Sequence, residues 1–310
     1  MDRLDPAAGP AREASGARPS PDASGAGLSP GGGACVLEAR GLGFAYPEAG
    51  EVLRGVDLSL HAGERLVLAG ANGSGKTTLL LLLAGLLTPR EGTLLCDGQP
   101  RGRSRRAVRA WHSRVGLVFQ DPDDQLFAPT VFEDVSFGPL NQGCDAALTR
   151  QRVDRALAAL GIADLAERPP HSLSFGQKKR VSIAGVLAME PGVLLLDEPT
   201  AGLDPEACED LLETLAALAA SGTAVVVATH TMDEAWAWAD RIALFGGQRI
   251  VACGPPEAIF RDLSLLETLH LREPLLFGVA RRLADAGLLP PGHPLPRTQA
   301  ALFSLLSQGT

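Results

Sequence analysis

The stretch G-A-N-G-S-G-K-T at Gly70–Thr77 decides the fold of this chain, because its spacing is that of a phosphate-binding loop. The apolar run Leu66–Leu68 before it predicts a strand, and Lys76–Leu83 after it predicts a helix. Such a loop needs this strand, turn and helix around it. Its glycines allow a tight turn, so that backbone N–H groups and the helix N-terminus point at phosphate oxygens. We therefore expect a nucleotide-binding α/β domain.

The polar residues of this loop have separate expected tasks at the β- and γ-phosphates of ATP. Lys76 adds a full positive charge, Thr77 supplies a hydroxyl for Mg²⁺, and Thr78 continues the phosphate contacts. A glycine loop with a purely structural role is the alternative. The predicted ATP-binding residues of this segment are Gly70, Ala71, Asn72, Gly73, Ser74, Gly75, Lys76, Thr77 and Thr78.

A second motif, V-L-L-L-D-E at Val193–Glu198, begins with an apolar run that predicts a buried strand. That strand would carry Asp197 and Glu198 to the carboxyl edge of a parallel sheet, beside the phosphates. Two adjacent carboxylates can there take different roles. A pair that merely caps a following helix is the alternative.

Strand-like and helix-like segments alternate along the chain, which favours a layered α/β fold with a mostly parallel central sheet. Between about residues 121 and 187 the pattern changes to turns and amphipathic segments such as Thr149–Leu160, which predict an inserted helical subdomain. The predicted strands are Val56–Leu60, Arg65–Ala69, Val115–Phe119, Val193–Leu196, Ala224–Ala228 and Arg241–Phe245.

The element L-S-F-G-Q at Leu173–Gln177, which we call the signature element, narrows the class of protein. It lies between the two motifs above, and its helix is predicted over Lys178–Met189. Together with Gln120, Asp204 and His230, the motifs stand in an order that resembles the ATP-binding subunit of an ABC transporter. The resemblance covers roughly residues 36–262 and implies a P-loop NTPase core, an ABC ATPase domain over residues 35–263, with an added antiparallel β subdomain.

The same resemblance implies an ATP hydrolase. Glu198 would be the general base that polarises the attacking water, a role worth roughly 10²- to 10⁴-fold in rate. His230 would contact the γ-phosphate and the glutamate, although an isolated histidine at a strand end is usually structural. The implied catalytic residues are Glu198, His230, Lys76 and Gln120, and the implied Mg²⁺ ligands are Thr77, Gln120 and, through water, Asp197.

Tyr46 is the only tyrosine of the chain and precedes the phosphate loop. In the family an aromatic ring at this place stacks on adenine, and such stacking contributes about 0.5–1.5 kcal/mol beyond area burial. Pro47 after it favours extended geometry and suggests an exposed loop. Packing in the core is the alternative for this ring.

In ABC proteins the signature element completes the ATP site of a second ATPase subunit. The resemblance therefore places Ser174, Gly176 and Gln177 at the ATP of a partner, with Asp204 at the interface. Asp204-Pro205 is also a good helix start by itself, and both interpretations stand. One phosphate loop and one signature element occur in this chain, so the mechanism requires a homo- or heterodimer.

Phe175 replaces the commoner glycine of the signature element, and Phe119–Phe127 reads F-Q-D-P-D-D-Q-L-F. Both features look like the energy-coupling-factor branch, especially its cobalt and nickel importers. The acidic residues Asp121, Asp123 and Asp124 could form a plain turn or part of a surface that grips a membrane partner. An ATPase of another importer or an exporter, or a soluble ABC ATPase acting on ribosomes or nucleic acid, is the alternative function.

Composition fits one large domain with appendages, since 310 residues with 45% apolar content can bury a sizeable core. A net charge of -8 disfavours nucleic acid as a partner. The cysteines are scattered singly, no histidine and cysteine cluster predicts a metal site, and a cargo metal would be held by another subunit.

No apolar run approaches the roughly 20 residues that span a bilayer, so we expect no transmembrane helix. The resemblance implies a peripheral protein on the cytoplasmic face of the cell membrane. Its expected partners are integral coupling and substrate-binding subunits. Residues 1–34, rich in Gly, Pro, Ala and Ser, predict a disordered tail without a signal peptide. Residues 264–310 predict a helical or irregular extension in which we find no motif.

Overall fold

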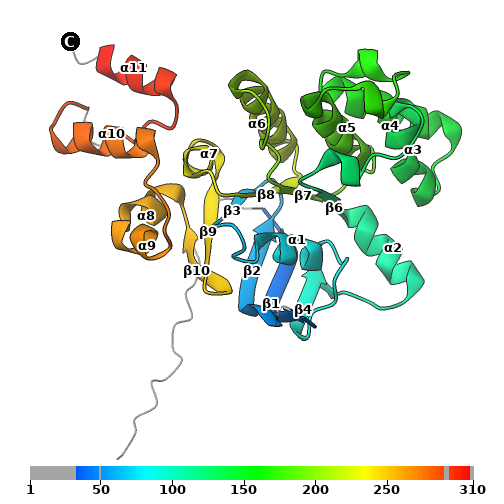
Figure 1. Ribbon diagram of the computed structural model, residues 1–310, viewed down its shortest axis with the longest axis horizontal. Coiled ribbons are helices and arrows are strands. Elements are labelled where there is room, and N and C mark those ends of the chain that lie inside the picture. The colour runs from blue at the N-terminus through cyan, green and yellow to red at the C-terminus, as the bar shows by residue number, and fades with distance from the viewer. Residues whose placement is uncertain (1–32, 49, 290–292, 308–310) are drawn as a thin grey trace, which may run out of the picture.

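The computed structural model describes residues 33–48, 50–289 and 293–307, and its strands form two sheets (Figure 1). The predicted tail therefore lies outside the described residues, apart from residues 33 and 34. The central sheet has the order β10-β9-β3-β8-β7-β6. Its members are β3 (Arg65–Ala69), β6 (Val115–Val118), β7 (Val193–Asp197), β8 (Ala224–Thr229), β9 (Arg241–Gly246) and β10 (Arg249–Gly254). All neighbours are parallel except β9 and β10, which confirms the predicted mostly parallel sheet.

The second sheet is antiparallel, in the order β2-β1-β4-β5. Its strands are β1 (Cys35–Tyr46), β2 (Gly50–His61), β4 (Glu91–Cys96) and β5 (Gln99–Pro100). The predicted strand Val56–Leu60 is the second half of β2 and so belongs to this sheet, not to the parallel one. Tyr46, expected in an exposed loop, is instead the last residue of β1 and pairs with Gly50.

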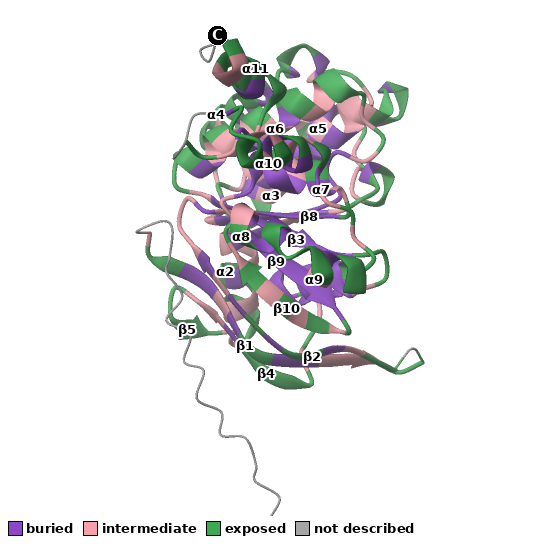
Figure 2. Cartoon of the chain, turned by 90° about the vertical axis from the view of Figure 1, so that its left-hand side faces the viewer, coloured by how far each residue is buried: buried purple, intermediate pink, exposed green. Residues whose placement is uncertain are grey.

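Both faces of the central sheet are buried, which explains its almost continuous apolar strands. Because side chains alternate along a strand, Leu66 and Leu68 of β3 pack toward the antiparallel sheet and Val67 packs toward the opposite face. Figure 2 shows the buried residues concentrated in these strands. Helix α1 (Lys76–Leu83) follows β3 after the phosphate loop and buries Leu79 and neighbouring leucines in the core between the sheets.

Residues 119–192 are all described and contain helices without a strand. After α2 (Arg105–Arg114) and β6 come the short turns η1 (Pro122–Asp124), η2 (Ala163–Leu165) and η3 (Pro170–Ser172) and the helices α3 (Val131–Gln142), α4 (Ala146–Ala159) and α5 (Phe175–Leu187). Helix α5 begins three residues before the predicted Lys178, because Ser174 and Gln177 form a capping box. Figure 1 shows α3, α4 and α5 together at one end of the central sheet.

The remaining helices are α6 (Pro205–Ala220), α7 (Met232–Trp238), α8 (Pro256–Arg261), α9 (Leu263–Thr268), α10 (Leu275–Asp285) and α11 (Gln299–Ser307). The last four lie at the other end of the sheet (Figure 1). Of these, α8 and α10 pack on α7 through Trp236, whose ring centroid lies 4.8 Å from that of Phe277 and 6.2 Å from that of Phe260. The Trp236 indole also donates to the carbonyl of Pro296 at 3.2 Å. Buried residues of α8, α9 and α10 share one core with α7, while Ala280, Leu289 and Leu302 form a smaller cluster.

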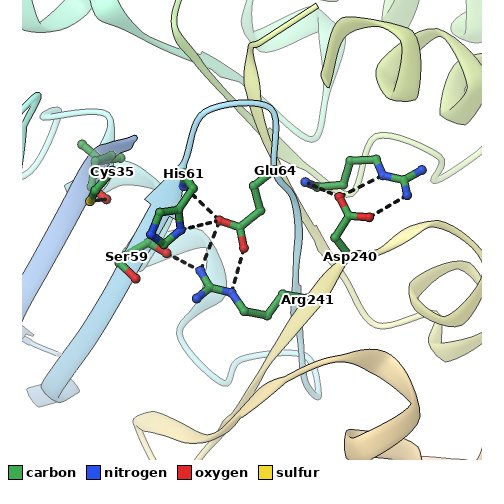
Figure 3. Close-up of polar contacts among 8 residues, drawn as sticks. Cys35, Ser59, His61, Glu64, Asp240 and Arg241 are labelled. Carbon is green, nitrogen blue, oxygen red and sulfur yellow. Dashed lines mark hydrogen bonds and ion pairs between the residues drawn. The ribbon is translucent and has the colours of Figure 1, made fainter. Parts of the chain in front are cut away.

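Polar side chains join the two sheets at the amino ends of β3 and β9 (Figure 3). The buried carboxylate of Glu64 accepts from the His61 backbone N–H at 2.9 Å and pairs with Arg241, 2.8 Å from Nε to Oε1. Arg241 also donates to the carbonyl of Ser59 in β2. Removing one partner of such a buried pair costs about 3–5 kcal/mol, because it leaves an uncompensated charge. This cluster therefore holds the amino ends of β3 and β9, at the end of the sheet opposite the phosphate loop.

Candidate functional site

A cavity of about 330 Å³ lies at the carboxyl ends of β3 and β7, within the size range of ligand sites. Its walls come from the phosphate loop, from the segment after β6 and from the ends of β7 and β8. The residues that line it are Val52, Asn72, Gly73, Ser74, Gly75, Lys76, Thr77, Thr78, Gln120, Asp197, Glu198 and His230.

The phosphate loop has a backbone that only glycine adopts without strain at two places. Gly73 has φ of 75° and Gly75, the N-cap of α1, has φ of 110°. At Gly70 a Cβ would lie 2.8 Å from the carbonyl oxygen of Phe245, so a side chain cannot fit there. The turn brings the free N–H groups at the start of α1 to the cavity, which makes this end of the helix an anion site.

Lys76 supplies the positive charge of this site from a buried position. Its Nζ donates to the carbonyls of Gly70 at 2.8 Å and Ala71 at 3.1 Å. Burial lowers the pKa of Lys76, and the carboxylates of Glu198 and Asp197 act in the opposite direction. The Lys76 ammonium is therefore held inside the phosphate loop, where it would bind phosphate oxygens.

The two adjacent carboxylates occupy different environments. Asp197 ends β7, and its Oδ2 accepts a hydrogen bond from the Thr77 hydroxyl at 2.6 Å. Burial raises the pKa of Asp197, while the bond from Thr77 lowers it. Glu198 has φ of 45°, in the left-handed region, and its carboxylate Oε1 lies 2.9 Å from Nδ1 of His230. The strained backbone directs the two side chains apart, one to a hydroxyl and one to an imidazole.

Hard oxygen donors gather where a Mg²⁺ ion of MgATP would be held. The Thr77 hydroxyl, the Asp197 carboxylate and the Gln120 amide all line the cavity. Mg²⁺ prefers such ligands and is usually bound by one or two carboxylates together with substrate phosphates and waters. The residues present therefore fit this ion.

Gln120 is fixed through its backbone by a lysine that sequence reasoning missed. Lys179 is fully buried, and its Nζ donates to the Gln120 carbonyl. Burial lowers the pKa of Lys179, against the carboxylates of Asp121, Asp197 and Glu198. This bond joins the helix of the signature element to the segment that brings Gln120 into the cavity.

Several predicted site residues lie outside the lining of this cavity. Gly70 and Ala71 form the loop beneath Lys76. Tyr46 is a neighbour, because its hydroxyl lies 3.5 Å from Oγ1 of Thr78, and its ring meets Phe44 edge to face at 4.9 Å. The residues at the helix starts, Ser174, Gly176, Gln177 and Asp204, are not among those that line the cavity.

Those helix-start residues make caps within the chain. Ser174 and Gln177 bond to each other's backbone N–H groups at 3.0 and 3.3 Å, and Asp204 accepts from Ala207 N at 2.9 Å. Phe175 packs on the next loop, since a Cβ at Gly202 would lie 2.9 Å from its ring. The signature element and the segment ahead of Asp204 are thus in contact within one chain.

The acidic residues after Gln120 form the turn that was one of the two alternatives. Asp121 caps η1 by accepting from Asp123 N at 2.9 Å, and Asp123 pairs with Lys178 at 2.6 Å. Two of the three carboxylates are therefore used inside the chain.

Other residues of the site gave no signal in the sequence. Val52 lines the cavity from β2, far from any motif. Glu234 lies four residues after His230 and bonds to Thr200, which follows Glu198 by two residues.

Two features of the described residues bear on transport. None of the helices in the described ranges combines the length and apolar character needed to cross a membrane. Among the same residues, no group of three or more His, Cys, Asp or Glu side chains could hold a metal ion.

Comparison with known proteins gives consistent matches. The ABC transporter family model matches residues 53–201. The chain is 49% identical, over 89% of its length and 98% of the relative, to the cobalt import ATP-binding protein CbiO of Rhodobacter capsulatus. It is 43% identical, over 87% of its length and 68% of the relative, to the energy-coupling factor transporter ATP-binding protein EcfA2 of Methanospirillum hungatei.

One solved structure has a similar fold. The structure of cbiO1 from Clostridium perfringens, described as part of the ABC transporter complex cbiONQ, superposes with a TM-score of 0.69 at 38% identity. It covers 80% of this chain and 99% of that one. The α/β architecture with a mixed, mostly parallel central sheet is shared with it, which confirms the predicted fold class.

Proposed function

The chain belongs to the ATP-binding proteins of ABC transporters, and we propose that it is the ATP-hydrolysing subunit of an energy-coupling-factor importer for cobalt or nickel. One observation carries the chemistry: a lysine, a helix N-terminus, a hydroxyl and two differently paired carboxylates meet in one cavity. The cargo rests on the names of the relatives, one of which is a cobalt import protein that matches 89% of this chain.

ATP binding uses the residues at the start of α1. The N–H groups of the loop and the Lys76 ammonium would hold the β- and γ-phosphates, and Thr77, Asp197 and Gln120 would hold Mg²⁺. When bound, the ion neutralises charge that develops on the phosphates. Tyr46, close to Thr78, would stack on the adenine.

Hydrolysis uses the pair at the ends of β7 and β8. Glu198 would accept the proton of the attacking water, because its carboxylate faces the cavity and lies next to the phosphate loop. His230 holds that carboxylate at 2.9 Å and so fixes its direction. Asp197 keeps the Thr77 hydroxyl in place at 2.6 Å.

The proposed ATP site also requires a second ATPase subunit. The signature residues Ser174, Gly176 and Gln177 lie outside the lining of the chain's own cavity, as they would if they served the ATP of a partner. Two copies, or this chain and a related one, would then enclose two ATP molecules between them. ATP binding would close the dimer, and hydrolysis with phosphate release would reopen it.

An apolar groove is the proposed contact with the integral membrane subunit. The groove has a volume of about 570 Å³ and lies between α2 and α3, with Gln125 at its wall. Three of its residues are strongly exposed for their type: Leu86 at 50%, Phe127 at 67% and Phe137 at 52%. Large exposed apolar patches mark interaction sites. Through this groove the chain would be held at the cytoplasmic face of the cell membrane.

Co-purification tests the transport role directly. The chain is tagged at its natural level, membranes are extracted in mild detergent, and the proteins that remain bound are identified. An integral scaffold together with a substrate-binding membrane subunit would support the proposal, whereas ribosomes or nucleic acid from the soluble fraction would overturn it. Uptake of radioactive cobalt and nickel by cells that depend on this system then decides the cargo.

A matched variant separates assembly from catalysis. Lys76→Ala removes the charge of the phosphate site, so we expect it to lose ATP affinity and uptake. It should still co-purify with the membrane subunits, because Lys76 is buried away from the groove. If uptake persisted in this variant, transport would not depend on ATP binding at this site, and the proposal would be wrong.

A further inference from the structure

Glu234 is a carboxylate on the first turn of α7 that the proposed hydrolysis does not use. Its Oε2 accepts a hydrogen bond from the Thr200 hydroxyl at 2.9 Å. Thr200 is 6% exposed, so water competes little for this bond. Burial raises the pKa of Glu234, and the bond from Thr200 lowers it.

The bond joins two segments that each carry a residue of the candidate site. Thr200 follows Glu198 by two residues, and Glu234 follows His230 by four. The first link between the segments is the contact of Glu198 with His230 at 2.9 Å, and the second is the bond of Thr200 to Glu234. These two side-chain links add to the backbone bond from Glu198 N to the Ala228 carbonyl at 2.9 Å, and they fix the relative direction of the segments beyond the ends of β7 and β8.

The Thr200 segment also leads to the proposed subunit interface. The Thr200 carbonyl accepts from Leu203 N at 3.1 Å, and Asp204 follows as the cap of α6. Phe175 of the signature element packs on Gly202 in the same loop. A shift of Thr200 would therefore move the carboxylate of Glu198 on one side and the interface loop on the other.

We propose that Glu234 is a positioning residue, which through the Thr200 hydroxyl holds Glu198 against His230 in the geometry that activates water. The inference rests on the proposed ATP hydrolysis. It assigns to Glu234 no contact with ATP and no proton transfer. Its loss should lower kcat and leave the KM for MgATP nearly unchanged, because the phosphate loop is on another segment.

A double-mutant cycle on the full-length chain tests this role. Glu234→Ala and Thr200→Val should each lower kcat about tenfold, since small displacements of reacting groups have large effects on rate. The double variant should fall no further than the lower single variant, because both changes remove the same bond. Thr200→Ser, which keeps the hydroxyl, should stay within about twofold of the unmodified chain.

Asp233→Ala is the matched control. Asp233 is on the same turn of α7, but its carboxylate accepts from Leu275 N at 2.7 Å in the C-terminal part. We expect this variant to keep its kcat. Circular dichroism and the melting temperature establish that each variant is folded, and Thr200→Val carries the test if Glu234→Ala is not.

The outcomes distinguish this inference from the proposed function. If the unmodified chain hydrolyses no ATP, the proposed function fails. If it hydrolyses ATP and a folded Glu234→Ala or Thr200→Val variant keeps its kcat, only the positioning role fails. Additive losses in the double variant, or an equal loss in Asp233→Ala, would likewise overturn it, because the effect would then be a general disturbance of α7.

Discussion

Replacing Glu198 with glutamine should separate ATP binding from ATP hydrolysis. The two side chains have nearly the same size, so the left-handed backbone at φ of 45° and the position beside His230 can both be kept. The phosphate contacts come from Lys76 and the start of α1, and these stay in place. The amide, however, cannot accept a proton from water at neutral pH. We expect nucleotide affinity within about threefold of the unmodified chain, because one site charge has changed and no phosphate contact has been lost.

The size of the expected rate loss follows from the role that is removed. A positioned general base contributes roughly 10²- to 10⁴-fold, which is about 3–5 kcal/mol of the activation barrier. Glu198 is 7% exposed, so bulk water cannot easily replace its carboxylate as a base. Turnover should therefore fall at least about 100-fold.

Phosphate release under saturating MgATP measures turnover, and fluorescence of a bound nucleotide analogue measures affinity. Glu213→Gln, which removes an exposed carboxylate in the middle of α6, is the matched control and should behave as the unmodified chain. Near-normal turnover of Glu198→Gln would refute the assignment of this residue as the base.

Three further predictions follow from described contacts. Tyr46→Ala should raise the KM for MgATP about two- to tenfold with kcat unchanged, as expected from the stacking energy, and an unchanged KM in steady-state kinetics would reduce the ring to packing on Phe44. Phe277→Ala should lower the free energy of unfolding in urea by about 3–5 kcal/mol, since its ring is fully buried against Trp236, and a loss below about 1 kcal/mol would contradict the shared core. Burial raises the pKa of Cys96 from 9.0 to about 11. Between these pH values the thiol of the unfolded chain releases its proton while that of the folded chain keeps it, so the free energy of unfolding falls as the pH rises. Urea unfolding of Cys96→Ala at both ends of this window should show a weaker fall than the unmodified chain, and equal falls would contradict the raised pKa.

Local patterns predicted the elements around the nucleotide best. The strand Arg65–Ala69 and the helix Lys76–Leu83 have the predicted bounds in the structure. The glycine loop between them determines where the strand ends and where the helix begins. The start of α5 was placed three residues late, since the apolar pattern does not show the capping box of Ser174 and Gln177. Boundaries set by a side-chain cap need that cap to be recognised.

Features that depend on distant residues could not be predicted in this way. The β strand that ends at Tyr46 gains its stability from pairing with β2 and β4, and its own sequence alternates weakly. Lys179 resembles any solvated lysine in the sequence, yet it is fully buried because it reaches the Gln120 carbonyl. The bond between Thr200 and Glu234 spans 34 residues and is visible in three dimensions alone.

The packing of α7 on the C-terminal helices has a consequence for synthesis. Trp236 finds its neighbours in Phe277 and the Pro296 carbonyl, which are made long after His230 has emerged. Domains generally fold as units while the chain grows from its N-terminus. Here the helix that follows His230 completes the contacts of its tryptophan only once residue 296 is available. A nascent chain that already has every nucleotide motif therefore still lacks part of the contacts that cover this tryptophan.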